Sequence, residues 1–373
     1  MVVQFNFPTP IRFGLGAIDE LADSLVPHKK PLLVTDRNIA KLGFVTKILD
    51  QMSKAGLDVK VFSDIEGNPV ESDVTKGVES YKGHGADCLV LLGGGATLDV
   101  GKAIALLASH PGSLFDYEDG NPNALPTPHD FPFMVAIPTT SGTGSEVGRS
   151  SVISDDKTKA KKIIFSPKML PNLVIADPKL TEGLPPAITA ATGVDALTHL
   201  IEAYLAKGFH PMCDGIALEG IRLVSKSLKK AVDNGSDLEA RADMLAASMM
   251  GAVAFQKGLG VNHSCAHALS TVFDTHHGLA NALMLPACME FNQEAVPDRF
   301  TTMARTIGLE KGEDFVPWLR KLNASIGIDG GLKGQGVDVT EALLDVAEAD
   351  ICHPLGPRPV SREDFRKLYQ KSM

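Results

Sequence analysis

Carboxylate and imidazole side chains recur at helical spacing in the second half of the chain. Asp195 and His199 are four residues apart, and His263 and His267 repeat this spacing. Residues four apart share one face of an α-helix. One carboxylate with several imidazoles, His277 among them, suits a divalent cation such as Fe²⁺, Zn²⁺, Co²⁺ or Ni²⁺. The pattern therefore favours a metal site over a set of hydrogen-bonded core histidines.

A glycine-rich turn, Gly93 to Gly95, follows the apolar run 88–92 and precedes a helical pattern. A helix N-terminus offers unpaired backbone N–H groups and the positive end of the helix dipole, and glycine lets a pyrophosphate approach closely. The turn matches neither the Walker A pattern nor GxGxxG. By itself it fits a phosphate site or a tight turn that binds nothing.

A second polar loop, AIPTTSGTGSE at 136–146, follows another apolar run. Both loops leave the carboxyl ends of predicted parallel strands, which favours binding of phosphate or ribose oxygens over a capped surface turn. Asp36 ends a further predicted strand. A carboxylate there can accept a hydrogen bond from a ribose 2′-hydroxyl and favours NAD over NADP, or it only caps the helix that follows.

The elements that position these residues follow from the hydrophobic pattern. Short apolar runs alternate with helical patterns in the first half, which predicts βαβ units and a mostly parallel sheet. The expected strands are 31–36, 58–64, 87–93, 133–139 and 173–178, and the expected helices are 17–26, 38–55, 71–85 and 97–108. From Pro185 the apolar residues follow helical spacing. We expect an α/β domain at 1–184 and an all-α domain at 185–373.

Composition narrows the class of protein. Hydrophobic residues make up 44% of the chain and charged residues 22%, as in ordinary globular proteins. The net charge of -9 argues against a nucleic-acid partner. No apolar run approaches the roughly 20 residues that span a bilayer, and the N-terminus lacks a signal-peptide pattern. The five cysteines are scattered and suit reduced thiols. We expect a cytoplasmic protein without a membrane partner.

The chain resembles the iron-containing (group III) alcohol dehydrogenases. The likeness runs nearly end to end and is carried by IRFGLGA, GGGATLDVGKA, IPTTSGTGSEV, ATGVDALTHLIEAY, NHSCAHALS, HHGLANALMLP and GPRPVSREDF. The resemblance implies a dehydroquinate synthase-like architecture, with a dinucleotide-binding α/β domain and a helical metal-binding domain. It also implies reversible oxidation of a small primary or secondary alcohol to an aldehyde or ketone by hydride transfer. The implied assembly is a homodimer or a larger homo-oligomer.

The resemblance also implies which residues bind the metal and the cofactor. It implies the metal ligands Asp195, His199, His263 and His277, and a proton relay at His267. It implies cofactor contacts from Asp36, Asn68, Gly94, Gly95, Ala96, Asp99, Thr139, Thr140, Thr143 and Lys161. The implied cofactor is NAD, with NADP as the alternative, and the implied metal is Fe²⁺, with Zn²⁺ or another divalent metal as the alternative. Ala96 departs from the family, which often has Ser there.

Other functions remain open at this point. A zinc-dependent glycerol dehydrogenase-like or dehydroquinate synthase-like enzyme would share the architecture. A metal-dependent hydrolase would also use Asp and His ligands, but it needs no dinucleotide-binding turn. A binding protein without catalysis is the remaining alternative.

Overall fold

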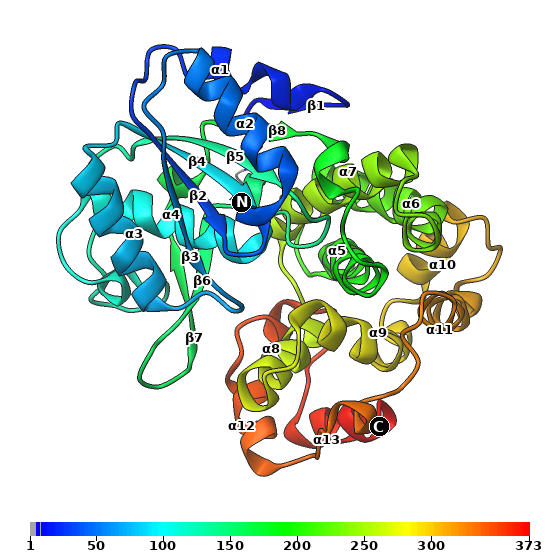
Figure 1. The fold of residues 1–373 in the computed structure, drawn as a ribbon. Coiled ribbons are helices and arrows are strands. Elements are labelled where there is room, and N and C mark those ends of the chain that lie inside the picture. Colours follow the sequence, from blue (N-terminus) through cyan, green and yellow to red (C-terminus); the bar gives the residue numbers. More distant parts are fainter. Residues whose placement is uncertain (1–4, 8) are drawn as a thin grey trace. The chain divides into compact units, whose positions relative to one another are not determined.

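The computed structural model describes residues 5–7 and 9–373, which form two compact units (Figure 1). Within the described residues, the first unit comprises 9–140 and 145–181, and we call it the α/β unit. The second comprises 5–7, 141–144 and 182–373, and we call it the helical unit. The polar loop 136–146 thus contributes residues to both units.

The α/β unit is built on a six-stranded sheet with the order β1-β8-β5-β4-β2-β3, in which every neighbouring pair is parallel. The strands are β1 (Ile11–Phe13), β2 (Pro31–Asp36), β3 (Lys60–Ile65), β4 (Cys88–Gly93), β5 (Phe133–Pro138) and β8 (Leu173–Ala176). The central strand β4 is buried along its whole length, as expected for a parallel sheet covered on both faces. The predicted mostly parallel sheet is confirmed.

The helices of this unit are α1 (Leu21–Ser24), α2 (Gly43–Lys54), α3 (Glu71–His84) and α4 (Gly95–Ser109). The helix expected at 38–55 begins only at Gly43. The segment before it turns because Asp36 Oδ1 accepts hydrogen bonds from the backbone N–H groups of Asn38 and Ile39, both at 2.9 Å. Such a carboxylate offers the chain an alternative to an immediate helix.

A two-stranded antiparallel hairpin, β6 (Ser150–Ser154) and β7 (Lys161–Phe165), forms a separate small sheet. The sequence pattern did not predict it, and it did not predict β1 either. Each of these strands is short, from three to five residues. A short apolar run lacks the length that separates a strand from irregular chain.

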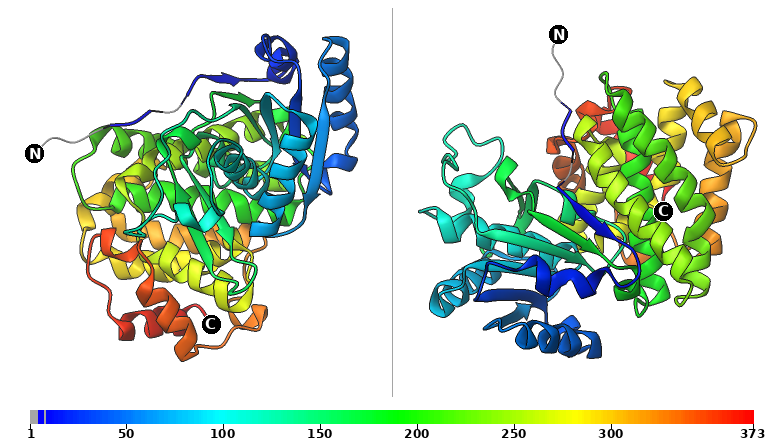
Figure 2. Two further views of the ribbon diagram at one scale, coloured as in Figure 1. Left: turned by 90° about the vertical axis from the view of Figure 1, so that its left-hand side faces the viewer. Right: turned by 90° about the horizontal axis from the view of Figure 1, so that it is seen from above.

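The helical unit contains α5 (Pro186–Leu205), α6 (Pro211–Asp233), α7 (Leu238–Ala254), α8 (Val261–Phe273), α9 (His277–Gln293), α10 (Pro297–Thr306), α11 (Phe315–Ser325), α12 (Glu341–Ala349) and α13 (Arg362–Lys371). Helices α5, α6 and α7, coloured green to yellow-green, pack side by side (Figure 2). Helix α5 is buried almost throughout, as expected of a helix that is apolar on all sides. Its few ionisable side chains therefore need partners inside the unit.

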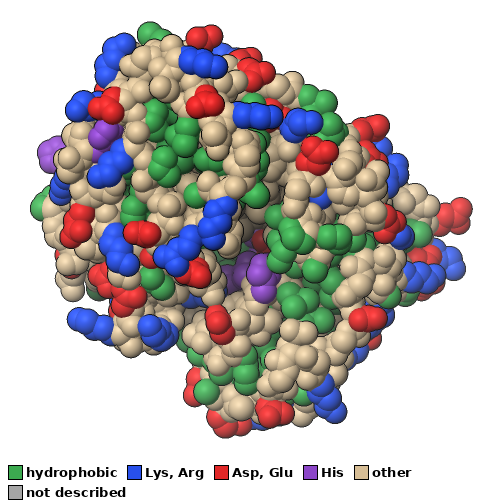
Figure 3. Space-filling view, viewed as in Figure 1, with side chains coloured by type: hydrophobic (Ala, Val, Ile, Leu, Met, Phe, Trp, Pro, Cys, Tyr) green, Lys and Arg blue, Asp and Glu red, His purple; other side chains and the backbone are tan. Residues whose placement is uncertain are grey.

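Charged side chains of both signs are interspersed over the face seen in Figure 3. Across the described residues, no single helix is long and apolar enough to cross a membrane. One bent pair, residues 238–257 with 261–273, meets the length and composition requirements only when its two parts are taken together.

Candidate metal centre and cofactor-binding loops

Four side chains from three helices of the helical unit converge. Helix α5 carries Asp195 and His199, α8 carries His263, and α9 begins at His277. One ligand atom from each lies within 4.8 Å of the others. Asp195 Oδ1 lies 3.4 Å from His277 Nε2 and 4.0 Å from His199 Nε2. The structure thus brings the four predicted ligands together at a spacing that one cation can bridge.

The protonation states of Asp195 and His199 suit a cation. Burial raises the pKa of Asp195, but the imidazoles of His199, His277 and His263 outweigh burial, so the pKa lies below the usual value. Burial lowers the pKa of His199 to about 4, although Asp195 favours the charged ring. At neutral pH the carboxylate is ionised and His199 is neutral, which are the forms that bind metal.

His263 provides the test of whether a cation fits this cluster. Its ring is 1% exposed, and its Nδ1 lies 2.6 Å from Glu202 Oε2. An ionised carboxylate accepts only, so the Nδ1 proton faces Glu202, and in the neutral ring Nε2 carries a lone pair. No hydrogen-bond partner among the described residues reaches Nε2. A buried acceptor without a partner is costly, and a cation would satisfy it.

Asn281 completes the surroundings of the carboxylate. Its Nδ2 donates to Asp195 Oδ1 at 2.7 Å, and Asn262 Nδ2 donates to Asn281 Oδ1 at 2.9 Å. Asn281 and Glu202 were not predicted from the sequence. Both had a signal, because Asn281 stands four residues after His277 and Glu202 stands three after His199. Those spacings put each residue on the ligand-bearing face of its helix.

His267 lies beside the four-residue cluster without belonging to it. Its ring stacks on that of His277 with 5.4 Å between centroids, and its side chain is 28% exposed. Its Nδ1 lies 2.8 Å from Asp350 Oδ2. Burial raises the pKa of Asp350, but hydrogen bonds from His267, Ser264 and Cys352 hold it well below its usual range. Asp350, which the sequence analysis also missed, is therefore an ionised acceptor for His267.

Within the α/β unit, the two predicted cofactor loops meet. Strands β4 and β5 are neighbours with Gly93 opposite Pro138, and Thr139 N donates to Gly93 O at 3.0 Å. A Cβ at Gly94 would lie 3.2 Å from Thr140 Oγ1, so only glycine lets the loops approach this closely without a shift. Helix α4 begins directly after this contact, and its first N–H groups, from Gly95 and Ala96, have no intrahelical partners. This is the arrangement that binds anions at the carboxyl edge of a parallel sheet.

Two other predicted cofactor residues lie at or after neighbouring strand ends. Asp36 ends β2, and among the described residues only its Oδ1 accepts hydrogen bonds, those from Asn38 and Ile39. These bonds form a turn, and helix α2 has Leu42 at its N-cap without a side-chain hydrogen bond, so Asp36 does not cap that helix. Asn68 is exposed in the connection between β3 and α3. Contact of either residue with the cofactor stays a prediction.

Asp99 and Lys102 tie α4 to the following chain. Asp99 accepts hydrogen bonds from Ser145 Oγ at 2.5 Å and from Val152 N at 3.0 Å. Lys102 is 1% exposed, lies 3.2 Å from Asp99 Oδ1 and donates to Ser145 O at 3.1 Å and to the carbonyl oxygen of Ser150. Asp99 thus orders the hairpin strand β6, and its predicted contact with a cofactor stays a prediction.

The last two predicted cofactor residues occupy different units. Thr143 belongs to the segment 141–144, which groups with the helical unit. Lys161 opens β7 opposite Ser154 in the α/β unit. Its neighbour Lys162 pairs with Glu118 Oε2 at 3.1 Å, so that ammonium group already has an anionic partner.

The buried carboxyl group of Glu146, at the end of the polar loop, should make the free energy of unfolding depend on pH. Burial raises its pKa to about 7, and Lys102 compensates only in part. Between the ordinary pKa of 4.5 and this value the folded state binds more protons than the unfolded state, so stability falls as pH rises through this range. In the wild type this effect should lower the free energy of unfolding by up to about 3 kcal/mol between pH 5 and pH 8. We expect Glu146→Gln to abolish this part of the decrease.

Urea unfolding at the two pH values checks this prediction. Glu79→Gln, an exposed change on α3 of the same unit, is the matched control and should keep the wild-type pH dependence. An equal fall in Glu146→Gln and in the wild type would contradict the prediction.

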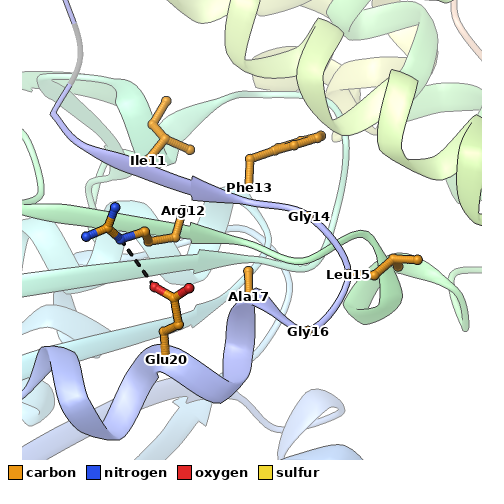
Figure 4. Close-up of a pocket in the computed structure, with 8 residues that line it drawn as sticks. All are labelled: Ile11, Arg12, Phe13, Gly14, Leu15, Gly16, Ala17 and Glu20. Atoms are coloured by element: carbon orange, nitrogen blue, oxygen red, sulfur yellow. Dashed lines mark ion pairs between the residues drawn. The ribbon is translucent and has the colours of Figure 1, made fainter.

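A surface pocket of the α/β unit lies beside β1 and the turn after it (Figure 4). Its lining includes an ion pair between Arg12 Nε and Glu20 Oε2 at 3.2 Å, with both side chains more than half exposed. Exposed pairs of this kind contribute little binding energy. None of the predicted site residues lines this pocket, so the strand-end loops and the histidine cluster are the better candidates.

Two family models match the chain. The model described as "Iron-containing alcohol dehydrogenase" matches residues 8–178, and "Fe-containing alcohol dehydrogenase family, C-terminal" matches residues 189–373. The 1,3-propanediol dehydrogenase of Citrobacter freundii is 39% identical over 100% of this chain and 98% of its own length. The 4-hydroxybutyrate dehydrogenase of Cupriavidus necator is 38% identical over 98% of each chain.

The solved structure of the alcohol dehydrogenase from Oenococcus oeni matches with a TM-score of 0.95 at 30% identity, covering 100% of both chains. These similarities confirm the predicted fold class and the predicted alcohol dehydrogenase. They do not favour the zinc-dependent glycerol dehydrogenase-like or dehydroquinate synthase-like alternative. The chain is an alcohol oxidoreductase that belongs to the iron-containing alcohol dehydrogenase family.

Proposed function

We propose that this protein catalyses the reversible NAD-linked oxidation of small primary or secondary alcohols, with Fe²⁺ held by Asp195, His199, His263 and His277. The convergence of these four ligand atoms within 4.8 Å carries the proposal. Two relatives are named for 1,3-propanediol and 4-hydroxybutyrate, both of which carry a terminal hydroxyl. Small primary alcohols with a second polar group are therefore the first substrates to test.

In this proposal, contacts within the helical unit orient the candidate ligands in the absence of a metal. Asp195 supplies the negative charge, and Asn281 orients it by a 2.7 Å hydrogen bond. His263 directs its unpartnered Nε2 toward the cluster. When bound, a divalent cation supplies Lewis acidity that stabilises negative charge developing on a substrate oxygen.

Residues of the two loops bind the dinucleotide in this proposal. The first N–H groups of α4, at Gly95 and Ala96, hold the pyrophosphate, and Thr139 and Thr140 of the second loop contribute further contacts. The further contacts proposed are Asp36, Asn68, Gly94, Asp99, Thr143 and Lys161. Asp36 favours NAD over NADP, because its charge repels a 2′-phosphate.

His267 moves the proton that the hydroxyl group releases. Its Nδ1–H is committed to Asp350, so Nε2 is the atom that takes up or returns a proton. Its partial exposure of 28% permits exchange with solvent. An imidazole suits this role because it changes charge near physiological pH.

We also propose a domain organisation, an assembly and a cellular location for this protein. Residues 1–184 form the dinucleotide-binding domain and 185–373 the catalytic domain, and the protein assembles as a homodimer in the cytoplasm. All five cysteines are free and buried, which suits a reducing compartment. The family resemblance supports the homodimer.

Anaerobic purification followed by Fe²⁺ or Zn²⁺ reconstitution tests the function. We expect NADH fluorescence to change on binding, and alcohol oxidation to require the metal. The substrate panel contains 1,3-propanediol, 4-hydroxybutyrate and simple primary and secondary alcohols, each with NAD⁺ and NADP⁺. Absence of NADH binding, or full turnover in metal-free protein, would contradict the proposal.

A further inference from the structure

Glu202 is a buried carboxylate on the same face of α5 as the candidate ligands Asp195 and His199. It stands seven residues after the first and three after the second, and it is 1% exposed. A carboxylate at this depth is strongly unfavourable unless hydrogen bonds or charges compensate it. The groups that compensate the buried charge of Glu202 therefore indicate its role.

Among residues 5–7 and 9–373, all hydrogen bonds to the side chain of Glu202 come from the start of α8. Oε1 accepts from Asn262 N at 2.7 Å, and Oε2 accepts from Gly260 N at 3.0 Å and from His263 N at 3.2 Å. Oε2 also lies 2.6 Å from His263 Nδ1. The carboxylate therefore satisfies backbone N–H groups at this helix N-terminus, where the helix dipole favours negative charge. One side chain fixes both the start of α8 and the ring of His263.

We propose that Glu202 is a positioning residue that sets the tautomer and direction of the His263 imidazole and thereby raises the affinity of the cluster for a divalent cation. This inference rests on the proposed function only in assuming that the cluster binds a metal. Residues that hydrogen-bond a metal-binding imidazole on its far nitrogen orient the ring and strengthen it as a donor.

The hydrogen-bond pattern leaves an amide at this position no good orientation. If the amide NH₂ of Glu202→Gln faces His263 Nδ1, that nitrogen must accept, and the ring proton moves to Nε2, where a metal must bind. If the NH₂ takes the place of Oε1 instead, it opposes the N–H of Asn262, and the negative charge behind His263 is lost. Both orientations weaken cation binding.

The experiment titrates the full-length metal-free protein with Co²⁺ against a competing chelator. We expect Glu202→Gln to raise the Kd for Co²⁺ by about 10- to 100-fold, the range typical of residues that orient metal ligands. The visible absorption bands of bound Co²⁺ should also shift. Asp243→Asn is the matched control, because Asp243 accepts from Ser227 Oγ at 2.5 Å and pairs with Lys226 Nζ at 3.0 Å, and it should leave the Kd unchanged.

A second variant keeps the carboxylate. A Cβ at Gly260 would lie 2.7 Å from Glu202 Oε1, and the backbone there is extended, so Gly260→Ala introduces steric displacement without backbone strain. We expect a smaller rise in the Co²⁺ Kd in the same direction. This variant tests the inference even if Glu202→Gln does not fold.

Thermal unfolding separates positioning from a purely structural role. We expect the rise in Tm that Co²⁺ produces in the wild type to shrink in Glu202→Gln. A variant that lowers the Tm of the metal-free protein but binds Co²⁺ with the wild-type Kd would overturn the inference. Failure of the wild type itself to bind Co²⁺ would instead count against the proposed function, so the two failures are distinguishable.

Discussion

An Asp195→Asn variant should lose its metal and, with it, nearly all turnover. Asp195 is the only carboxylate among the four candidate ligands, and its side chain is 3% exposed. Asparagine keeps the size and can keep the hydrogen bond from Asn281, so the change removes mainly the negative charge. Lewis-acid stabilisation of several kcal/mol corresponds to a fall in kcat/KM of roughly 10³-fold.

Metal analysis of the purified variant and steady-state kinetics check this result. Asp243→Asn is the matched control in the same unit, since Asp243 accepts from Ser227 Oγ at 2.5 Å and pairs with Lys226 Nζ at 3.0 Å. It should retain metal and turnover. If Asp195→Asn kept a full complement of metal and wild-type kcat/KM, the cluster could not be the catalytic metal site.

Replacing His267 by Ala should lower kcat by roughly 10²-fold, the lower end of the range for a positioned acid–base group, while leaving metal content intact. The side chain stacks on His277 but lies outside the four-residue cluster. Asp350→Asn should lower kcat less, since His267 remains but loses its anionic partner.

The control for this prediction is His353→Gln. His353 Nε2 lies 3.2 Å from the carbonyl oxygen of Glu348, and its ring packs near Phe365. Its replacement should leave kcat unchanged. Wild-type kcat in His267→Ala would exclude the proton-relay role, and loss of metal from that variant would assign His267 to the metal site instead.

The grouping of carboxylate and imidazole side chains on helix faces and most of the parallel sheet were predictable because their signals are local. Spacings of four place Asp195 with His199, and His263 with His267, on single helix faces, whatever surrounds them. The core strands β2 and β4 are continuous apolar runs, because both faces of a parallel sheet are buried. These patterns depend only on helix and strand geometry.

Residues that act on the ligands from a distance could not be predicted in the same way. Glu202 and His263 are 61 residues apart, and His267 and Asp350 are 83 apart. No local period connects such pairs. Glu202 had a signal in its spacing from His199, but nothing in the sequence pairs it with the start of α8. Likewise, Asp36 shortens the expected helix 38–55 through a turn that propensity alone does not reveal.

Residue types and helical spacing therefore favour a metal site in the second half of the chain and phosphate-binding turns in the first. The individual ligands and the proton relay at His267 were implied by the family resemblance. The tautomer of His263, the anionic partner of His267 and the meeting of the loops after β4 and β5 depend on long-range packing. They arise because buried polar groups must find partners, and only the folded chain determines which partners lie within hydrogen-bond distance.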